Sequence, residues 1–391
     1  MCDVIESKKK LKIINNQNSE IMKKQILRLF IAAIAVSLLL TSCEQNPRPN
    51  TDQDSILPDQ FGIDIPDAIS YAATQFKGTK AVEPVNGNVI YEHLGNFINV
   101  GEGGAEIVGD IIKGIVIYQI NEPMSFSFNG DDDGRVKNLE VLADSYYDGV
   151  VWEFELTITD ADSEGNEDDG MALQIFWNRS PRKGIAILKP YNIDRDDSGE
   201  FANAVYRIDY SEEGDRGYDA HMLVAISGLP IPDPLENPYS MSTLKMFVGK
   251  KGDVVDVYGN SDHPNATFFN SDSGFNWAFV ASGDDVLNIG VAEVGLPASN
   301  LDEPSRAVLL ETYSIKNVFS DQIYEVWPNI SQESVDNYLL NTTAPGFFNQ
   351  DGFVQGGDSP SEDYSVLLDR LPSLSPYNPK EVADMIIDFK Y

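Results

Sequence analysis

Residues 151–159, with the sequence VWEFELTIT, alternate large apolar side chains with polar ones. Successive side chains of a β-strand point to opposite faces of the sheet, so Trp152, Phe154, Leu156 and Ile158 are expected on one face, with Glu and Thr side chains on the other. This period of two predicts an antiparallel strand with one buried face.

Similar patterns precede and follow this strand. Alternation or short apolar runs bounded by turn residues occur at 124–128, 136–142, 171–177, 184–188, 204–210, 221–226, 243–248, 254–258, 275–281 and 286–294. The intervening stretches at 249–253 and 282–285 are typical of hairpin loops. About ten strands with no helices between them predict an α+β, mainly β protein built on an antiparallel barrel or sandwich.

Helices are expected before and after the strands. Residues 61–78 contain Asp64 as a helix cap, Pro66 in the first turn and Gly78 at the end. Residues 88–100 and 105–120 carry apolar side chains at helical spacing, with a glycine-rich turn between them. These N-terminal helices are expected to pack on the sheet. Short C-terminal helices are predicted at 307–316, 331–340 and 380–389, with a strand at 307–314 as the alternative to the first, and residues 341–360 are predicted to be irregular.

The segment 22–43, MKKQILRLFIAAIAVSLLLTSC, has the features of a signal peptide. Lys23, Lys24 and Arg28 precede an apolar run at 29–40, which is shorter than the ~20 residues that a membrane-spanning helix needs. The last four residues resemble the lipobox of bacterial lipoproteins. This resemblance implies that signal peptidase II cuts before Cys43 and that Cys43 carries a lipid thioether. Translation is expected to begin at Met22, since residues 1–21 are polar and fit no leader.

The residues after Cys43 are polar and contain proline and asparagine, so residues 43–60 are predicted to form a disordered tether. Their composition is similar to that of the export tethers of Bacteroidetes surface lipoproteins. Glu44 stands where enteric inner-membrane lipoproteins have aspartate. These resemblances imply an outer-membrane address, lipid-anchored and facing the cell surface. Residues 61–391 are expected to form one globular domain, helical over 61–120, β-rich over 121–300 and mixed over 301–391.

The charge of the chain excludes some classes of function. It carries 28 basic and 62 acidic residues, and residues 1–42 hold 7 and 3 of these, which leaves 21 basic and 59 acidic residues after the leader. Such a negative field repels phosphate backbones, so no nucleic-acid partner is expected. With three histidines in the chain, a histidine-built metal centre is not expected either.

The best candidate binding motif is the acidic loop at 160–170. It has oxygen ligands at its first, third and fifth positions and glycine at the sixth, like the opening of a calcium loop. Met171 stands where an EF-hand has glutamate, which excludes that motif. The candidate calcium ligands are Asp160, Asp162, Glu164, Asn166 and Asp168. Two other acidic turns, at 129–134 and 194–197, are expected to be solvated loops.

No catalytic motif is present, and acidic pairs carry little information in a chain with so many acids. His93, on an apolar stripe, and all four tryptophans are expected in the core, and His263 has no evident partner. The favoured hypothesis is a non-enzymatic surface lipoprotein that binds a ligand. A glycan would suit an open aromatic strip at Phe275, Trp277 and Phe279. The alternatives are a carrier of lipid or another hydrophobic molecule in a barrel cavity, and a glycoside hydrolase with an unidentified carboxylate pair.

Overall fold

A computed structural model of the chain describes residues 55–70, 87–130, 133–163, 165–195, 199, 201–231, 240–266 and 274–390. The predicted leader, Cys43 and most of the predicted tether lie outside the described residues. None of the described helices combines the length and the hydropathy that crossing a bilayer requires.

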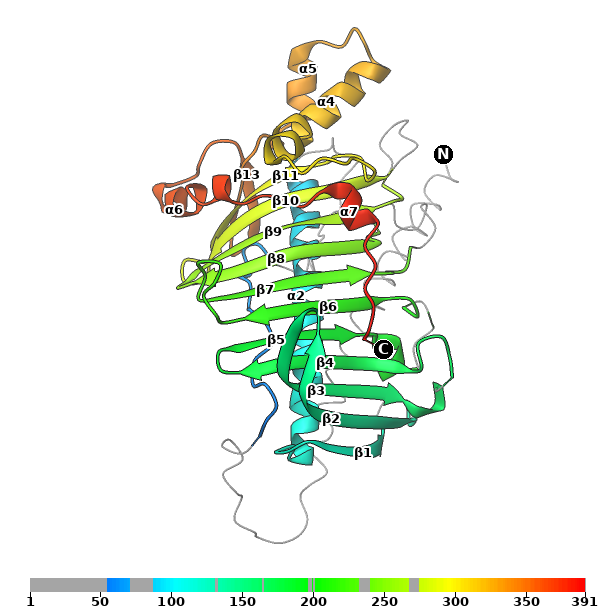
Figure 1. Cartoon of the computed structure of the whole chain (residues 1–391). Coiled ribbons are helices and arrows are strands. Elements are labelled where there is room, and N and C mark those ends of the chain that lie inside the picture. The colour runs from blue at the N-terminus through cyan, green and yellow to red at the C-terminus, as the bar shows by residue number, and fades with distance from the viewer. Residues whose placement is uncertain are drawn as a thin grey trace, which may run out of the picture.

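The described strands form one antiparallel sheet of thirteen strands, each paired with its neighbours in chain order (Figure 1). The strands are β1 (Met124–Asn129), β2 (Val136–Tyr147), β3 (Val150–Asp160), β4 (Met171–Arg179), β5 (Arg182–Leu188), β6 (Val205–Ser211), β7 (Ala220–Ser227), β8 (Thr243–Lys251), β9 (Val254–His263), β10 (Phe275–Asp284), β11 (Ile289–Gly295), β12 (Gly346–Asn349) and β13 (Gly352–Gly356). The mainly β, antiparallel prediction is confirmed. The barrel or sandwich is wrong, because the strands form a single open sheet with β1 and β13 at its edges.

A single long helix, α2 (Gly87–Ile115), crosses one face of this sheet. Its 29 residues span about 43 Å, which at ~4.8 Å per strand is enough to cross about nine strands. The predicted break at residues 101–104 is therefore wrong. Glycine is needed there for close packing, since a Cβ atom on Gly101 would lie 2.8 Å from Met246 Sδ and 3.1 Å from Leu244 Cδ2.

Residues 55–70 pack beside α2 on the same face. Ile56 N donates to Ile120 O, and Trp177 Nε1 donates 2.8 Å to Ile56 O. The helix predicted at 61–78 is wrong over its described part, 61–70, which is irregular apart from a turn that begins at Pro66. Residues 55–60, which the sequence assigns to the tether, include the buried side chains of Ile56 and Leu57.

The remaining described helices are short. They are η1 (Val116–Tyr118), η2 (Ala161–Ser163), α3 (Pro190–Ile193), the π-helix η3 (Val308–Thr312), α4 (Ile315–Val326), α5 (Gln332–Tyr338), η4 (Glu362–Tyr364), α6 (Ser365–Leu368), η5 (Leu371–Ser373) and α7 (Pro379–Ala383). The helix predicted at 331–340 is confirmed as α5. The one at 307–316 is instead η3 followed by the start of α4, and the one at 380–389 ends after α7. The region 341–360, predicted as irregular, contains β12 and β13.

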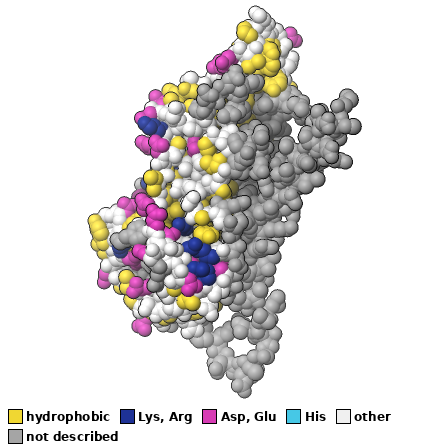
Figure 2. Space-filling model, turned by 90° about the vertical axis from the view of Figure 1, so that its right-hand side faces the viewer, with side chains coloured by type: hydrophobic (Ala, Val, Ile, Leu, Met, Phe, Trp, Pro, Cys, Tyr) yellow, Lys and Arg dark blue, Asp and Glu magenta, His cyan; other side chains and the backbone are white. Residues whose placement is uncertain are grey.

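Helices α4 and α5 project beyond the β13 end of the sheet (Figure 1), and hydrophobic side chains are visible on this projection at the top of Figure 2. Trp327, in the connection between the two helices, is 53% exposed. The core position expected for this tryptophan is therefore wrong. The other three tryptophans are buried, as predicted.

Both faces of the sheet are covered. The main core lies between the sheet, α2 and residues 55–70, and includes Phe154, Leu156 and Ile158 as predicted. Trp152 instead belongs to a separate cluster with Phe176, Ile185, Ile187 and Phe389. On β2, Ala143 pairs with Phe154 and Ser145 pairs with Trp152, and Asp144 between them has a φ of 55°. The C-terminal arm, residues 365–390, packs over this second face (Figure 1).

Candidate functional site

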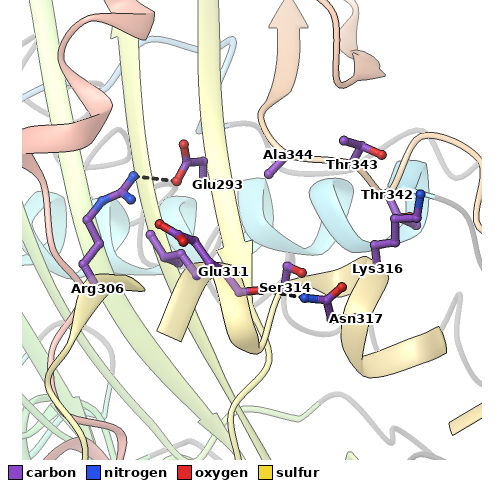
Figure 3. Close-up of a pocket in the computed structure, with 10 residues that line it drawn as sticks. Glu293, Arg306, Glu311, Ser314, Lys316, Asn317, Thr342, Thr343 and Ala344 are labelled. Atoms are coloured by element: carbon purple, nitrogen blue, oxygen red, sulfur yellow. Dashed lines mark hydrogen bonds and ion pairs between the residues drawn. The ribbon is translucent and has the colours of Figure 1, made fainter. Parts of the chain in front are cut away.

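A pocket of about 300 Å³ lies where β11, η3 and α4 meet the segment before β12 (Figure 3). This volume is at the lower end of the range for small-molecule sites. The pocket is lined by Glu293, Arg306, Leu310, Glu311, Ser314, Lys316, Asn317, Thr342, Thr343 and Ala344. Eight of the ten lining residues are of polar or charged types, both signs of charge are present, and none of the ten is aromatic.

One ion pair forms a fixed wall of the pocket. Arg306 Nη2 donates 2.5 Å to a carboxylate oxygen of Glu293 on β11, and Arg306 Nε donates 2.9 Å to the carbonyl oxygen of Leu374 in the C-terminal arm. About a fifth of each charged side chain is exposed. Because two of the nitrogens of Arg306 are bonded within the protein, this pair defines the shape of the pocket more than it offers a free charge.

Other polar groups on the lining are open to a ligand. Glu311 belongs to η3, a π-helical turn of the kind often found at functional sites. Asn317 Nδ2 donates 2.8 Å to the backbone oxygen of Glu311, which fixes the junction between η3 and α4. Lys316 is 3.4 Å from Asp336 of α5, and both side chains are more than 40% exposed. The pocket therefore presents a carboxylate, an ammonium group and the hydroxyl of Ser314.

The acidic loop predicted to bind calcium is held by basic side chains of the protein. Asp160 is fully buried, and its carboxylate accepts 2.9 Å from Arg135 Nε and 3.0 Å from Ser163 Oγ. Arg195 Nε lies 3.3 Å and Lys137 Nζ 3.9 Å from the same carboxylate. Burial opposes ionisation, but the hydrogen bonds from Arg135 and Ser163 hold the pKa of Asp160 below its ordinary value.

Asp168, at the other end of the loop, is paired in the same way. Its carboxylate accepts 2.5 Å from Lys189 Nζ and 2.9 Å from Asn192 Nδ2. Asp162 and Asn166 are exposed, and Glu164 lies outside the described residues. Within the described part of the chain, no group of three or more His, Cys, Asp or Glu side chains is placed to hold a metal ion. Calcium binding by this loop stays a prediction.

The turn at 129–134 joins this network through one residue. Asp133 accepts 2.8 Å from Lys137 Nζ and 3.1 Å from the backbone N–H of Arg195, and both side chains of its ion pair with Lys137 are almost fully buried. The expectation of a solvated loop therefore fails at Asp133. The sequence does not show this contact, because β2 and the segment after α3 meet only in the folded sheet.

The aromatic strip considered for glycan binding is closed. Phe275, Trp277 and Phe279 are 7%, 0% and 0% exposed and belong to the main core. His93 packs against Phe97 and Trp277, as expected of a core histidine, and burial lowers its pKa to about 4. His263, which had no evident partner in the sequence, lies 2.7 Å from Ser261 Oγ through Nε2. Both residues of this pair are fully buried.

No family model matches this chain, and neither the curated proteins nor the solved structures yield a match. The pocket was not visible in the sequence either. Its charged residues, Glu293, Arg306, Glu311 and Lys316, are unevenly spaced along the chain, and no motif links them.

Proposed function

We propose that this chain is an exported, lipid-anchored lipoprotein of the outer membrane that binds a small hydrophilic ligand without transforming it. The lipobox at Cys43 and its leader support the address. The observation that supports binding is the pocket, which is lined by both the carboxylate of Glu311 and the ammonium group of Lys316. A ligand with a cationic and an anionic end, such as an amino acid or a short peptide, matches this lining.

Binding by the pocket is testable with amino acids and dipeptides as zwitterionic probes, glucuronate as an anion and glucose as a neutral sugar. We expect zwitterions to bind in calorimetry and glucose not to bind, since the lining has no aromatic face on which a sugar ring would stack. Charged hydrogen bonds contribute ~1.5–3 kcal/mol each, so Glu311→Gln and Lys316→Met should each weaken binding by roughly tenfold or more.

Two variants sharpen this test. Glu325→Gln removes an exposed carboxylate from α4, the helix that carries Lys316, at a position outside the pocket, so it should leave binding unchanged. Asp336→Asn removes the competing partner of Lys316 and should tighten binding of the anionic end. Binding by Glu311→Gln and Lys316→Met at wild-type affinity would contradict the proposed site, and so would failure of every zwitterion to bind.

The second candidate function is glycoside hydrolysis. Its support is that two carboxylates, Glu293 and Glu311, line the same pocket and that Glu293 is held in an ion pair. Retaining and inverting glycosidases both use such a pair. Release of nitrophenol from nitrophenyl glycosides by the wild type, abolished in both Glu293→Gln and Glu311→Gln, would favour this function over simple binding.

The carrier of a hydrophobic molecule receives less support. The face of the sheet where a cavity would be expected is packed with side chains of α2 and of residues 55–70. The direct test is extraction of the purified protein with organic solvent, and a stoichiometric lipid in the extract other than the anchor would favour a carrier.

A further inference from the structure

The edge strand β1 leaves one side of its backbone without a strand partner among the described residues, where it pairs only with β2. Its sequence, MSFSFN, contains no charged residue and no proline. Natural edge strands usually carry a lysine, a proline or a bulge that prevents another strand from pairing. The other edge follows this rule, since β13 begins and ends with glycine and its pairing with β12 shifts between Phe347 and Phe348.

An apolar surface continues beyond β1 on the face that α2 covers. Phe126 and Phe128 lie on that face, with ring centroids 4.7 Å and 5.6 Å from the ring of Tyr118. Tyr118 belongs to η1, which follows α2 directly and lies near β1. Its neighbours Val116 and Ile117 are 41% and 67% exposed. An unpaired backbone edge and an exposed apolar patch therefore lie side by side.

We propose that β1 pairs with β1 of a second copy of this chain, which would join the two sheets around a two-fold axis. Residues directly opposite each other in an antiparallel pair point to the same face of the sheet. When a strand pairs with a copy of itself, its apolar side chains therefore stay on one face only if even-numbered residues lie opposite even-numbered ones and odd-numbered residues opposite odd-numbered ones. A register that places Ser127 opposite Ser127 of the other copy satisfies this condition. It also sets Phe126 opposite Phe128 in both directions, and aromatic cross-strand pairs are favourable.

The second copy is the occupant that fits the uncharged, alternating sequence of this edge. The uncharged alternation of β1 is complementary to itself, and the same axis brings the two exposed patches of Val116 and Ile117 toward one another. The net charge of −34 per chain opposes association, so the dimer should be favoured when the Debye length falls from ~14 Å to ~4 Å as salt is added.

Disulfide trapping in membranes tests the register on the full, lipid-anchored chain. Ser127→Cys should form a disulfide-linked dimer under mild oxidation, because the two substituted residues lie opposite each other. Ser125→Cys is the matched control. Ser125 is exposed on the same face of the same strand, but in this register its two copies lie four residues apart along the strands, about 14 Å. Equal crosslinking of the two variants, or none in Ser127→Cys, would overturn the proposal.

Association without a crosslink is tested by sedimentation of the detergent-solubilised protein over a roughly hundredfold range of concentration. The wild type should dimerise more strongly at high salt. Ser127→Lys places two like charges opposite each other and should give a monomer, whereas Ser127→Thr should still dimerise. A wild type that stays monomeric at every salt concentration contradicts the proposal, as does a folded Ser127→Lys variant that still dimerises.

Discussion

The carboxylate of Glu102, in the middle of α2, accepts a hydrogen bond of 2.6 Å from the backbone N–H of Ile65. It also accepts one from the hydroxyl of Ser70. These bonds fix residues 55–70 to the helix and lie next to the carboxylates of Glu106 and Asp64. Desolvation by burial outweighs the hydrogen bonds and raises the pKa of Glu102 to about 7.

Glu102 therefore makes stability depend on pH. Its pKa is higher in the folded chain than in the unfolded one, so the folded state binds the proton more tightly and stability falls as the pH rises from about 4.5 to about 7. Glu102→Gln keeps an acceptor for Ile65 and removes the charge. As the pH rises through this range, the free energy of unfolding of the variant should increase relative to that of the wild type, by at most about 3 kcal/mol. Urea titrations of both proteins at pH 5 and pH 8 measure the gain, with exposed Glu333→Gln as the control. A constant difference between variant and wild type at the two pH values would argue against this role.

The glycines of α2 differ in what they contact, and a pair of variants separates the effects. A Cβ atom added at Gly103 would meet no atom within 4 Å, so Gly103→Ala should stabilise the protein through helix propensity, by about 0.5–1 kcal/mol. Gly101→Ala gains the same propensity but must displace Met246 and Leu244. We expect Gly101→Ala to be less stable than Gly103→Ala by roughly 1–3 kcal/mol in thermal or chemical unfolding. Equal stability would show that α2 does not lie so close to β8.

Removal of Asp160 should be costly. Asp160→Asn leaves Arg135 and Arg195 facing a neutral amide at a fully buried position, and breaking such a network destabilises by about 3–5 kcal/mol, less where the cations reach solvent. Asp162→Asn, in the same loop but exposed, should cost close to nothing. The calcium hypothesis adds a separate expectation, namely that millimolar calcium raises the melting temperature of the wild type and not that of Asp160→Asn. An unchanged wild-type melting temperature would contradict it.

Lys390 closes a second buried network at the C-terminal arm. Its Nζ donates 2.8 Å to Glu155 and 3.0 Å to Ser145, and its backbone N–H donates to Gln174. Lys390→Met leaves Glu155, whose side chain is 7% exposed, without its cation. Because Lys390 itself is about a third exposed, we expect a loss of roughly 1–3 kcal/mol in the free energy of unfolding. Adding Glu155→Gln should restore part of it, whereas Lys380→Met, at a half-exposed ion pair, should have little effect. No recovery in the double variant would point to lost packing instead of lost charge.

The strands of this protein could be predicted because their pattern is local. All eleven strands expected between residues 124 and 294 are present, with boundaries that differ by a few residues. The alternation of apolar and polar residues at 151–159 indicates a strand with one buried face, and the sheet contains such a strand at this position. The number of sheets was not predictable in this way, because the same alternation serves a barrel, a sandwich and an open sheet covered by helices.

The errors arise where tertiary contacts override a local signal. Gly101, Gly103 and Gly104 favour a break in isolation, yet the sheet contacts made at Gly101 and Gly104 stabilise one continuous helix. Strands β12 and β13 are short and rich in glycine, so their sequence is typical of a loop. The charges of the pocket are brought together by the π-helical turn η3 and by the return of the chain at β12, and neither feature has a sequence pattern of its own.

The sheet topology has a consequence for how the chain acquires its shape. Since each described strand after β1 pairs with the strand just before it in the chain, each hairpin finds its template already in place as the polypeptide emerges in sequence order during synthesis. Assembly can thus proceed from the amino-terminal side, one ladder at a time, with little need to search for distant partners. In this order of assembly, the hydrogen bond from Lys390 to Glu155 forms last, because Lys390 lies at the C-terminal end of the chain.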